Sequence, residues 1–279
     1  MIDVSVCLIC YNQEKFIAEA IDSVLKQNHT FKMEIVISDD KSTDNTPAII
    51  KAYADKYPDK IKFNPSPVNL GMLRNWERAL KLCKGRYIAL LEGDDFWNDP
   101  DKLQKQFKIL EEDPGFAMSC TNAIMKHDSG EPDKVYVLKT GPRFTRADMM
   151  EYNFIPTCSI LMRNYISDTF FKPPYFKSPF ADWIVNFLVA GHGDIHFLNE
   201  FSCTYRIHDM GVWGGLKEEK QLKNWIKGLQ QLGELIDTKE LSEMNRAARK
   251  DIGGRLCLHY RKNGQLFKYL NQRFKLFFY

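Results

Sequence analysis

Short apolar runs of strand length alternate with helical periodicity through the first 115 residues. Continuous apolar stretches predict buried strands, and apolar positions spaced three and four apart predict helices. The expected strands are residues 4–10, 33–38, 61–64 and 87–91, and the expected helices are residues 16–27, 46–57, 73–83 and 100–112. Apolar strands joined by helices are typical of a mostly parallel sheet that helices cover on both faces.

The pattern is less regular from residue 116 onward. Further extended segments are expected at residues 116–123, 135–139, 159–163 and 203–208, with a helix at 181–190. From Glu218 the pattern is helical to the end, and the glycines Gly253-Gly254 and Gly264 predict breaks. We therefore predict an α/β domain over residues 1–215 and a helical C-terminal extension over residues 216–279.

Polar clusters follow three of the predicted strands, at Tyr11-Asn12, Asp39-Asp40 and Asp94-Asp95. In an open parallel sheet, ligands bind at the carboxyl ends of the strands. Adjacent carboxylates repel one another unless a cation or a hydrogen-bond donor offsets their charge. Each Asp pair could instead cap the helix that follows it. Because Asp44 can cap the first of these helices, we favour ligand contacts for the pairs.

Composition is that of an ordinary globular protein, with 44% hydrophobic and 27% charged residues. The net charge of +3 is unevenly spread. Residues 217–279 contain 14 Lys and Arg against 7 Asp and Glu, an excess of seven positive charges that leaves residues 1–216 at −4. The acidic part argues against a general nucleic-acid surface, whereas the basic tail could meet phosphates or anionic lipid heads.

The N-terminus and the cysteines indicate the cellular compartment of the protein. No apolar run approaches the roughly 20 residues of a membrane span, and Met1–Cys10 carries Asp3 and continues into a strand pattern rather than a signal peptide. We therefore expect a cytoplasmic protein. Cys7 and Cys10 form a C-x-x-C, but residues three apart on a strand point to opposite faces, so we expect buried thiols.

Three of these segments, in this order and spacing, resemble the family 2 glycosyltransferases of the GT-A fold. They are residues 4–12, residues 34–46 with Asp39-Asp40, and Glu92-Gly93-Asp94-Asp95-Phe96-Trp97. The resemblance covers roughly residues 2–215 and implies a nucleotide-binding half (1–115) and an acceptor-side half with a lid (116–215). It also implies transfer of a sugar from a nucleoside-diphosphate sugar, with UDP expected, to an acceptor hydroxyl.

The resemblance implies roles for the first two clusters. Asp40 is expected to read the base, since a carboxylate can accept the imide N–H of uracil. Asp39 is expected to support the same loop. The strand end from Ile9 to Tyr11, together with Asn12, is expected to line the base.

The third cluster is expected to hold the ribose and a metal ion. By resemblance, Asp94 accepts from the ribose and Asp95 holds Mn²⁺ or Mg²⁺, hard cations that favour carboxylate and phosphate oxygens. The ion would neutralise charge on the leaving nucleoside diphosphate. The family's usual Asp-x-Asp appears here as Glu92-Gly93-Asp94 followed by Asp95, which leaves the role of Glu92 open.

Asp182 resembles the general base of the family, at the start of a helix that contains Trp183. The alternative is a first-turn acid that the helix dipole favours. One base without a nucleophile implies a single displacement, which inverts the anomeric centre. Arg206 and His208 resemble a segment that closes over the diphosphate, so Arg206 is expected to pair with phosphate and His208 to ligate the metal. The alternative is that either is a surface residue of a strand. Trp213, in the expected lid, could stack on a sugar or only pack.

The sequence argues against three other functions. A non-catalytic sugar- or nucleotide-binding module on the same fold predicts loss of Asp95 or Asp182, and both are present. A dinucleotide-dependent oxidoreductase needs G-x-G-x-x-G after the first strand, where this chain has Cys10-Tyr11-Asn12. A nucleotidyltransferase would need a Gly-rich basic loop there, which is also missing.

The end of the chain is basic and rich in aromatic residues. A helix of this kind over residues 266–278 can lie on an anionic membrane, dock on the catalytic domain or form a homodimer seam. The membrane interpretation would suit a lipid-linked glycan acceptor in cell-surface polysaccharide synthesis, an expectation that rests on family analogy.

Overall fold

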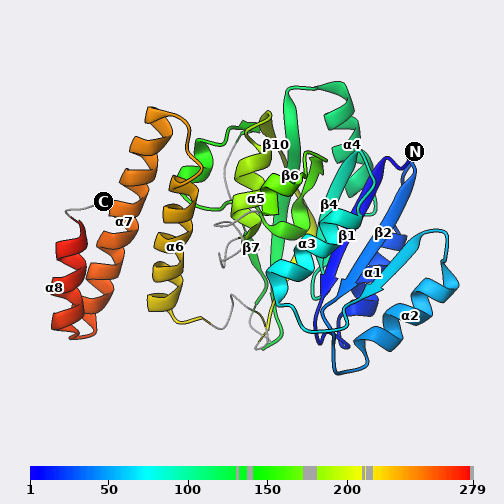
Figure 1. Ribbon diagram of the computed structural model, residues 1–279, viewed down its shortest axis with the longest axis horizontal. Helices are drawn as coiled ribbons and strands as arrows, with labels where there is room; N and C mark the ends of the chain where they lie inside the picture. The colour runs from blue at the N-terminus through cyan, green and yellow to red at the C-terminus, as the bar shows by residue number, and fades with distance from the viewer. Residues whose placement is uncertain (130–131, 137–140, 172–180, 209–210, 212–215, 277–279) are drawn as a thin grey trace.

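The computed structural model describes the chain except residues 130–131, 137–140, 172–180, 209–210, 212–215 and 277–279. Figure 1 shows a sheet with helices on both faces and, at one end of the molecule, the helices of the C-terminal extension. The predicted α/β fold class is confirmed by the sheet and by the solved structures described below.

The N-terminal half follows the predicted alternation closely. Its elements are β1 (Val4–Cys10), α1 (Ile17–Leu25), β2 (Met33–Asp39), α2 (Thr46–Lys56), β3 (Ile61–Pro65), α3 (Met72–Leu82), β4 (Tyr87–Glu92), β5 (Phe96–Trp97) and α4 (Lys102–Glu112). Every residue of β1 is buried, as expected of a strand that helices cover on both sides.

The second half is built around two long strands. Its elements are β6 (Phe116–His127), β7 (Lys134–Tyr136), β8 (Arg143–Phe144), β9 (Leu161–Arg163), α5 (Ala181–Val189) and β10 (Asp194–Ile207), with 3-10 helices η1 (Asp148–Met150), η2 (Thr157–Ser159) and η3 (Asp168–Phe171). The extended segment predicted at 203–208 is the end of β10, and the first nine residues of this strand were not predicted. The part of the predicted strand 135–139 beyond β7 lies outside the described residues.

In the described part of the chain, ten strands form one sheet, with the central order β3-β2-β1-β4-β9-β6-β10-β5. The pairs β1–β2, β1–β4, β2–β3 and β6–β10 are parallel. Each antiparallel pair joins only two or three residues. The carboxyl ends of β1, β2 and β4 therefore meet at one edge of the sheet.

Two hydrophobic clusters cover the two faces of the sheet. Cys7 belongs to one cluster and Cys10 to the other, because residues three apart on β1 point to opposite faces. All seven cysteines are buried and free, which confirms the expectation of buried thiols.

The C-terminal extension consists of α6 (Glu218–Gly233), α7 (Lys239–Lys262) and α8 (Leu266–Lys275). The break expected at Gly264 is present, but the one expected at Gly253-Gly254 is wrong, because both glycines lie inside α7. Gly253 is buried there, so the absence of a side chain suits its packing. Among the described helices, none combines the length and the apolar character that crossing a bilayer requires.

Leucine and isoleucine side chains of α6 and α7 join the same hydrophobic cluster as Phe154 and Trp183 of the second half. Asn245 of α7 donates hydrogen bonds to the carbonyl of Leu229 (2.7 Å) and to the sulfur of Met150 (3.9 Å). The extension is therefore packed into the second half of the α/β domain.

Candidate active site

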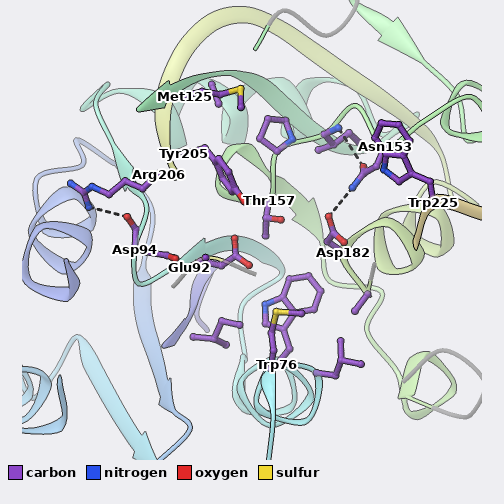
Figure 2. Close-up of a pocket in the computed structure, with 18 residues that line it drawn as sticks. Trp76, Glu92, Asp94, Met125, Asn153, Thr157, Asp182, Tyr205, Arg206 and Trp225 are labelled. Carbon is purple, nitrogen blue, oxygen red and sulfur yellow. Dashed lines mark hydrogen bonds between the residues drawn. The ribbon is translucent and has the colours of Figure 1, made fainter. Parts of the chain in front are cut away.

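A cavity of about 250 Å³ opens beside the carboxyl ends of β1 and β4. Carboxylates from two distant parts of the sequence border it: Glu92 and Asp94 follow β4, and Asp182 lies in the first turn of α5. Figure 2 shows the side chains of Glu92 and Asp182 directed toward the same space, with Asp94 beside Arg206. The chain therefore gathers acids at the edge of the sheet where ligands bind in open α/β folds.

Four of the predicted site residues border this cavity, namely Ile9, Asp94, Asp182 and Arg206. Among the other predicted residues, those that the structure describes lie outside its lining: Tyr11, Asn12, Asp39, Asp40, Asp95 and His208. Trp213 lies outside the described residues, as do the neighbouring positions of the expected lid.

Asp182 is held in place by Asn153, whose side-chain amide donates a hydrogen bond of 2.7 Å to one carboxylate oxygen. Burial raises the pKa of the Asp182 carboxyl above its ordinary value. Hydrogen bonds from the backbone N–H of Trp183 and from Asn153 stabilise the charged form and oppose that rise in pKa. The result is an oriented carboxylate that borders the cavity and takes a proton more readily than a solvated Asp.

Glu92 ends β4 and borders the cavity opposite α5. Burial raises its pKa to about 8, and the negative charges of Asp94 and Asp182 add to this effect. Glu92 therefore holds a proton more readily than a solvated Glu, and in its protonated form the carboxyl can donate a hydrogen bond.

Asp94 and Asp95 are neighbours in sequence but face different surroundings. Asp94 borders the cavity, and its Oδ2 lies 3.0 Å from Nε2 of His208. That hydrogen bond raises the pKa of His208, against the opposing effect of burial. Asp95 is 1% exposed, and its Oδ1 accepts the backbone N–H of Arg206 at 2.9 Å. Burial raises the pKa of Asp95 well above its ordinary value, and the charges of Asp94 and Glu92 raise it further.

Arg206 is buried and already has protein partners. Its guanidinium donates to the backbone carbonyl of Asp94 at 2.9 Å and pairs with Glu19 of α1. It also lies between the rings of Phe16 and Phe96, at 4.9 and 4.8 Å from their centroids. These contacts tie the end of β10 to the turn that carries Asp94.

The second Asp pair organises the loops beside the site. Asp40 is 2% exposed, and its two oxygens accept the backbone N–H groups of Leu70 and Gly71, each at 2.8 Å. Asp39 accepts both the backbone N–H and the hydroxyl of Ser42. Both carboxylates thus hold backbone segments at the carboxyl end of β2.

The loop after β1 is linked to the loop after β2. The backbone N–H of Asn12 donates to the hydroxyl of Ser42, and the side-chain oxygen of Asn12 accepts the N–H of Thr43, both at 2.8 Å. Asn12 has a φ of 52°, a left-handed conformation that asparagine tolerates better than most residues. Tyr11 is exposed beside this junction.

Most of the lining residues were not predicted, among them Trp76, Asn153, Tyr205 and Trp225. Tyr205 precedes Arg206 at the end of a predicted strand, and this position was the signal that could have predicted it. Trp76 is buried, and its indole N–H has no hydrogen-bond partner in the described part of the chain. Trp225 comes from α6, in the extension that the sequence analysis treated as separate.

No three His, Cys, Asp or Glu side chains among the described residues come together in a way that could hold a metal ion by themselves. Asp95 nevertheless has a buried Oδ2 without a hydrogen-bond partner in the described structure, and Asp94 offers hard oxygen ligands to the cavity. The donor set therefore fits a cation that takes few protein ligands and completes its coordination with substrate and water.

A family model described as "Glycosyl transferase family 2" matches residues 5–170. The chain belongs to glycosyltransferase family 2. The matched region contains Asp40, Glu92, Asp94 and Asp95 but ends before Asp182.

Curated relatives of this family 2 chain include WfaP of Escherichia coli, described as a UDP-Glc:alpha-D-GlcNAc-diphosphoundecaprenol beta-1,3-glucosyltransferase. It is 32% identical over 229 residues, which are 81% of this chain and 86% of WfaP. An uncharacterised protein of Mycobacterium tuberculosis is 35% identical over 214 residues, 75% of this chain. This chain spans 60% of the length of that mycobacterial relative.

Solved structures share the fold at low sequence identity. Residues 1–349 of Staphylococcus aureus TarS in complex with UDP align with a TM-score of 0.62 and 17% identity, over 98% of this chain and 91% of that one. The mannosyltransferase PcManGT from Pyrobaculum calidifontis, in complex with GDP-Man and Mn²⁺, aligns with a TM-score of 0.63 and 14% identity. The alignment covers 93% of this chain and 75% of PcManGT.

Proposed function

We propose that this family 2 chain is an inverting glycosyltransferase that moves a sugar from a UDP-sugar to an acceptor hydroxyl. The observation that carries the proposal is the shared cavity, where Asp182 of α5 faces the acids at the end of β4. The UDP-binding fold of TarS and the UDP-glucose donor in the description of WfaP support the choice of nucleotide.

Asp182 is the proposed general base. It takes the proton of the acceptor hydroxyl as the oxygen attacks the anomeric carbon, while the bond to the leaving diphosphate breaks on the opposite face of the sugar. The carboxylate is oriented by Asn153, and burial raises its pKa toward working pH, which suits proton transfer. One displacement by one oxygen inverts the configuration.

Asp94 is the proposed protein ligand of Mn²⁺ or Mg²⁺, and His208, hydrogen-bonded to the same carboxylate, fixes its orientation. The sequence expectation gave this role to Asp95. Asp94 is preferred because it borders the cavity, and Asp95, whose buried Oδ2 has no hydrogen-bond partner among the described residues, is the second candidate ligand. The bound cation would supply charge neutralisation for the leaving diphosphate. PcManGT, with the same fold, is described with Mn²⁺.

The interlocked loops after β1 and β2 are the proposed nucleotide platform. Ile9 borders the cavity, and Asp39, Asp40 and Asn12 hold the neighbouring backbone. Tyr11, exposed at their junction, is available to contact the base or ribose. Arg206 is assigned a positioning role, since its guanidinium already pairs with Glu19.

The function is tested by incubating the purified full chain with Mn²⁺ and a panel of UDP- and GDP-sugars, and by measuring released nucleoside diphosphate. We expect slow hydrolysis of at least one UDP-sugar and none of the GDP-sugars. Binding of UDP-sugar without any release, with or without glycoside acceptors, would instead identify a non-catalytic binding module.

The pH dependence of transfer provides a test of Asp182 and Asn153. A raised pKa keeps Asp182 protonated up to a higher pH than a free Asp, so activity should fall as pH drops through that pKa. The Asn153 hydrogen bond favours the charged form, so Asn153→Ala should move the acidic limb of kcat/KM to higher pH. An unchanged limb would contradict the assignment of Asp182 as the titrating base.

The proposed acceptor is a lipid-linked glycan, in cell-surface polysaccharide synthesis. The acceptor named for WfaP is a GlcNAc-diphosphoundecaprenol, and α8 offers a means of reaching such a lipid. The apolar side chains of Leu266, Phe267, Leu270 and Phe274 on α8 are exposed, Phe267 by 90%. Basic Lys268, Arg273 and Lys275 lie on the same helix, a composition that suits an anionic bilayer surface.

Vesicle binding tests this surface. Wild-type protein should co-sediment with phosphatidylglycerol vesicles and only weakly with phosphatidylcholine, because both apolar burial and positive charge contribute. The double substitution Phe267→Ser and Phe274→Ser should weaken binding about tenfold or more. Val68→Ser, at an exposed apolar residue of the N-terminal half, is the control. A dimer that depends on Phe267 would instead assign the surface to a second copy of the chain.

A further inference from the structure

The C-terminal extension contributes one aromatic side chain to the active-site cavity. Trp225 lies on α6, and its indole borders the cavity together with Asn153 and Pro156. In the same helix, Leu222, Ile226 and Leu229 are buried in the hydrophobic cluster shared with the second half of the domain. The backbone that carries Trp225 is therefore anchored to the cavity wall.

The indole of Trp225 is also held from the side of α7. The guanidinium of Arg255 lies over its ring, 5.3 Å from the centroid. A cation over one face of an indole is attracted to the ring electrons and restricts how the side chain moves. Two helices thus position an aromatic ring at the rim of the cavity, where it can receive a ligand at little cost in conformational entropy.

Trp225 lies on the acceptor side of the reacting centre. In the view of Figure 2, Asp182 lies between Glu92 on one side and Trp225 on the other, with Asn153 beside the indole. The hydrogen bond from Asn153 to Asp182 links this side of the cavity directly to the proposed base. A donor diphosphate held near Asp94 would occupy the opposite side.

The surrounding surface suits a sugar ring. Ile155, Pro156 and Trp225 give apolar area, whereas the carboxylates provide hydrogen-bond acceptors at the other end. A pyranose has an apolar face of C–H groups and a rim of hydroxyls, so it can stack on an indole while directing one hydroxyl toward a carboxylate.

We infer that Trp225 forms an acceptor subsite that stacks on the pyranose ring of the accepting sugar and positions its hydroxyl beside Asp182. The inference rests on the proposed function and names the element that selects the acceptor. Trp225 lies beyond residues 5–170, the part matched by the family model. Acceptor choice is therefore assigned to a segment outside the part of the chain that the family model matches.

The experiment is saturation-transfer NMR on the full chain with Mg²⁺, UDP and a panel of octyl pyranosides: glucoside, galactoside, mannoside and N-acetylglucosaminide. At least one pyranoside should receive saturation on its ring protons with wild-type protein. Trp225→Ala should reduce that signal at least fivefold, and Trp225→Phe, which keeps an aromatic face, should retain most of it. Thermal unfolding checks that both variants are folded.

UDP binding, followed in the same samples, separates the two proposals. Equal UDP binding in all three proteins, with the pyranoside signal reduced only in Trp225→Ala, supports the subsite. Saturation that is unchanged in Trp225→Ala, or absent from every pyranoside with wild-type protein, overturns it. Loss of UDP binding in Trp225→Ala would show that the residue acts on the donor side, and this result would also overturn the acceptor subsite. Failure of wild-type protein to bind UDP would instead count against the proposed function.

Discussion

Asp182→Asn should lower the rate of glycosyl transfer by about 10²- to 10⁴-fold, the contribution that a positioned general base makes. Asparagine is nearly the same size as aspartate and can still accept the hydrogen bond from Asn153, so the fold of α5 should persist. What it cannot do is take the proton of the acceptor hydroxyl. The affinity for UDP should therefore stay within about twofold of wild type, because Asp182 acts on the acceptor.

The measurement is kcat for transfer alongside calorimetric titration of UDP with Mn²⁺. Asp55→Asn, an exposed residue paired with Lys51 on α2, is the matched control and should leave both values unchanged. If Asp182→Asn retained more than about a tenth of the transfer rate, the base would have to be another residue, with Glu92 the next acid on the cavity.

Asp94→Asn should produce the second large loss. We expect the transfer rate to fall about 100-fold and the apparent affinity for Mn²⁺ to fall about 10- to 100-fold. The change removes the carboxylate that borders the cavity and leaves His208 beside a neutral amide. A cation that neutralises the leaving diphosphate would then be held less tightly. Titration of activity with Mn²⁺ measures both effects.

Asp95→Asn is the discriminating control for that prediction. Its Oδ1 accepts the backbone N–H of Arg206, which an amide oxygen can also do, and its carboxyl lies outside the lining of the cavity. We expect a loss of less than about tenfold. If Asp95→Asn lost more activity and more Mn²⁺ affinity than Asp94→Asn, the cation would be held at Asp95, as the sequence alone suggested.

The N-terminal half was predictable because its strands are buried on both faces. An apolar run such as Val4–Cys10 has no other stable environment, so its ends in the sequence match its ends in the structure. The long strand Asp194–Ile207 was recognised only at its end, because residues 198–201 in its middle are partly or fully exposed and its register is irregular near Phe201.

Two features of the site could not be predicted from the sequence for a similar reason. The sequence places Asp94 and Asp95 after the same strand, but the turn decides which of two neighbours borders the cavity and which is buried. Trp225 could not be assigned at all, because its approach to Asn153 depends on the packing of α6 against elements far away in the chain. Periodicity reports which face of a helix is apolar, not what that face meets.

The most direct test of the account is a crystal structure of the full chain with a UDP-sugar and Mn²⁺. We predict that the diphosphate lies beside Asp94, with the anomeric carbon open toward Asp182 across the same cavity. A nucleotide bound elsewhere on the molecule, or one separated from Asp182 by protein, would contradict the account.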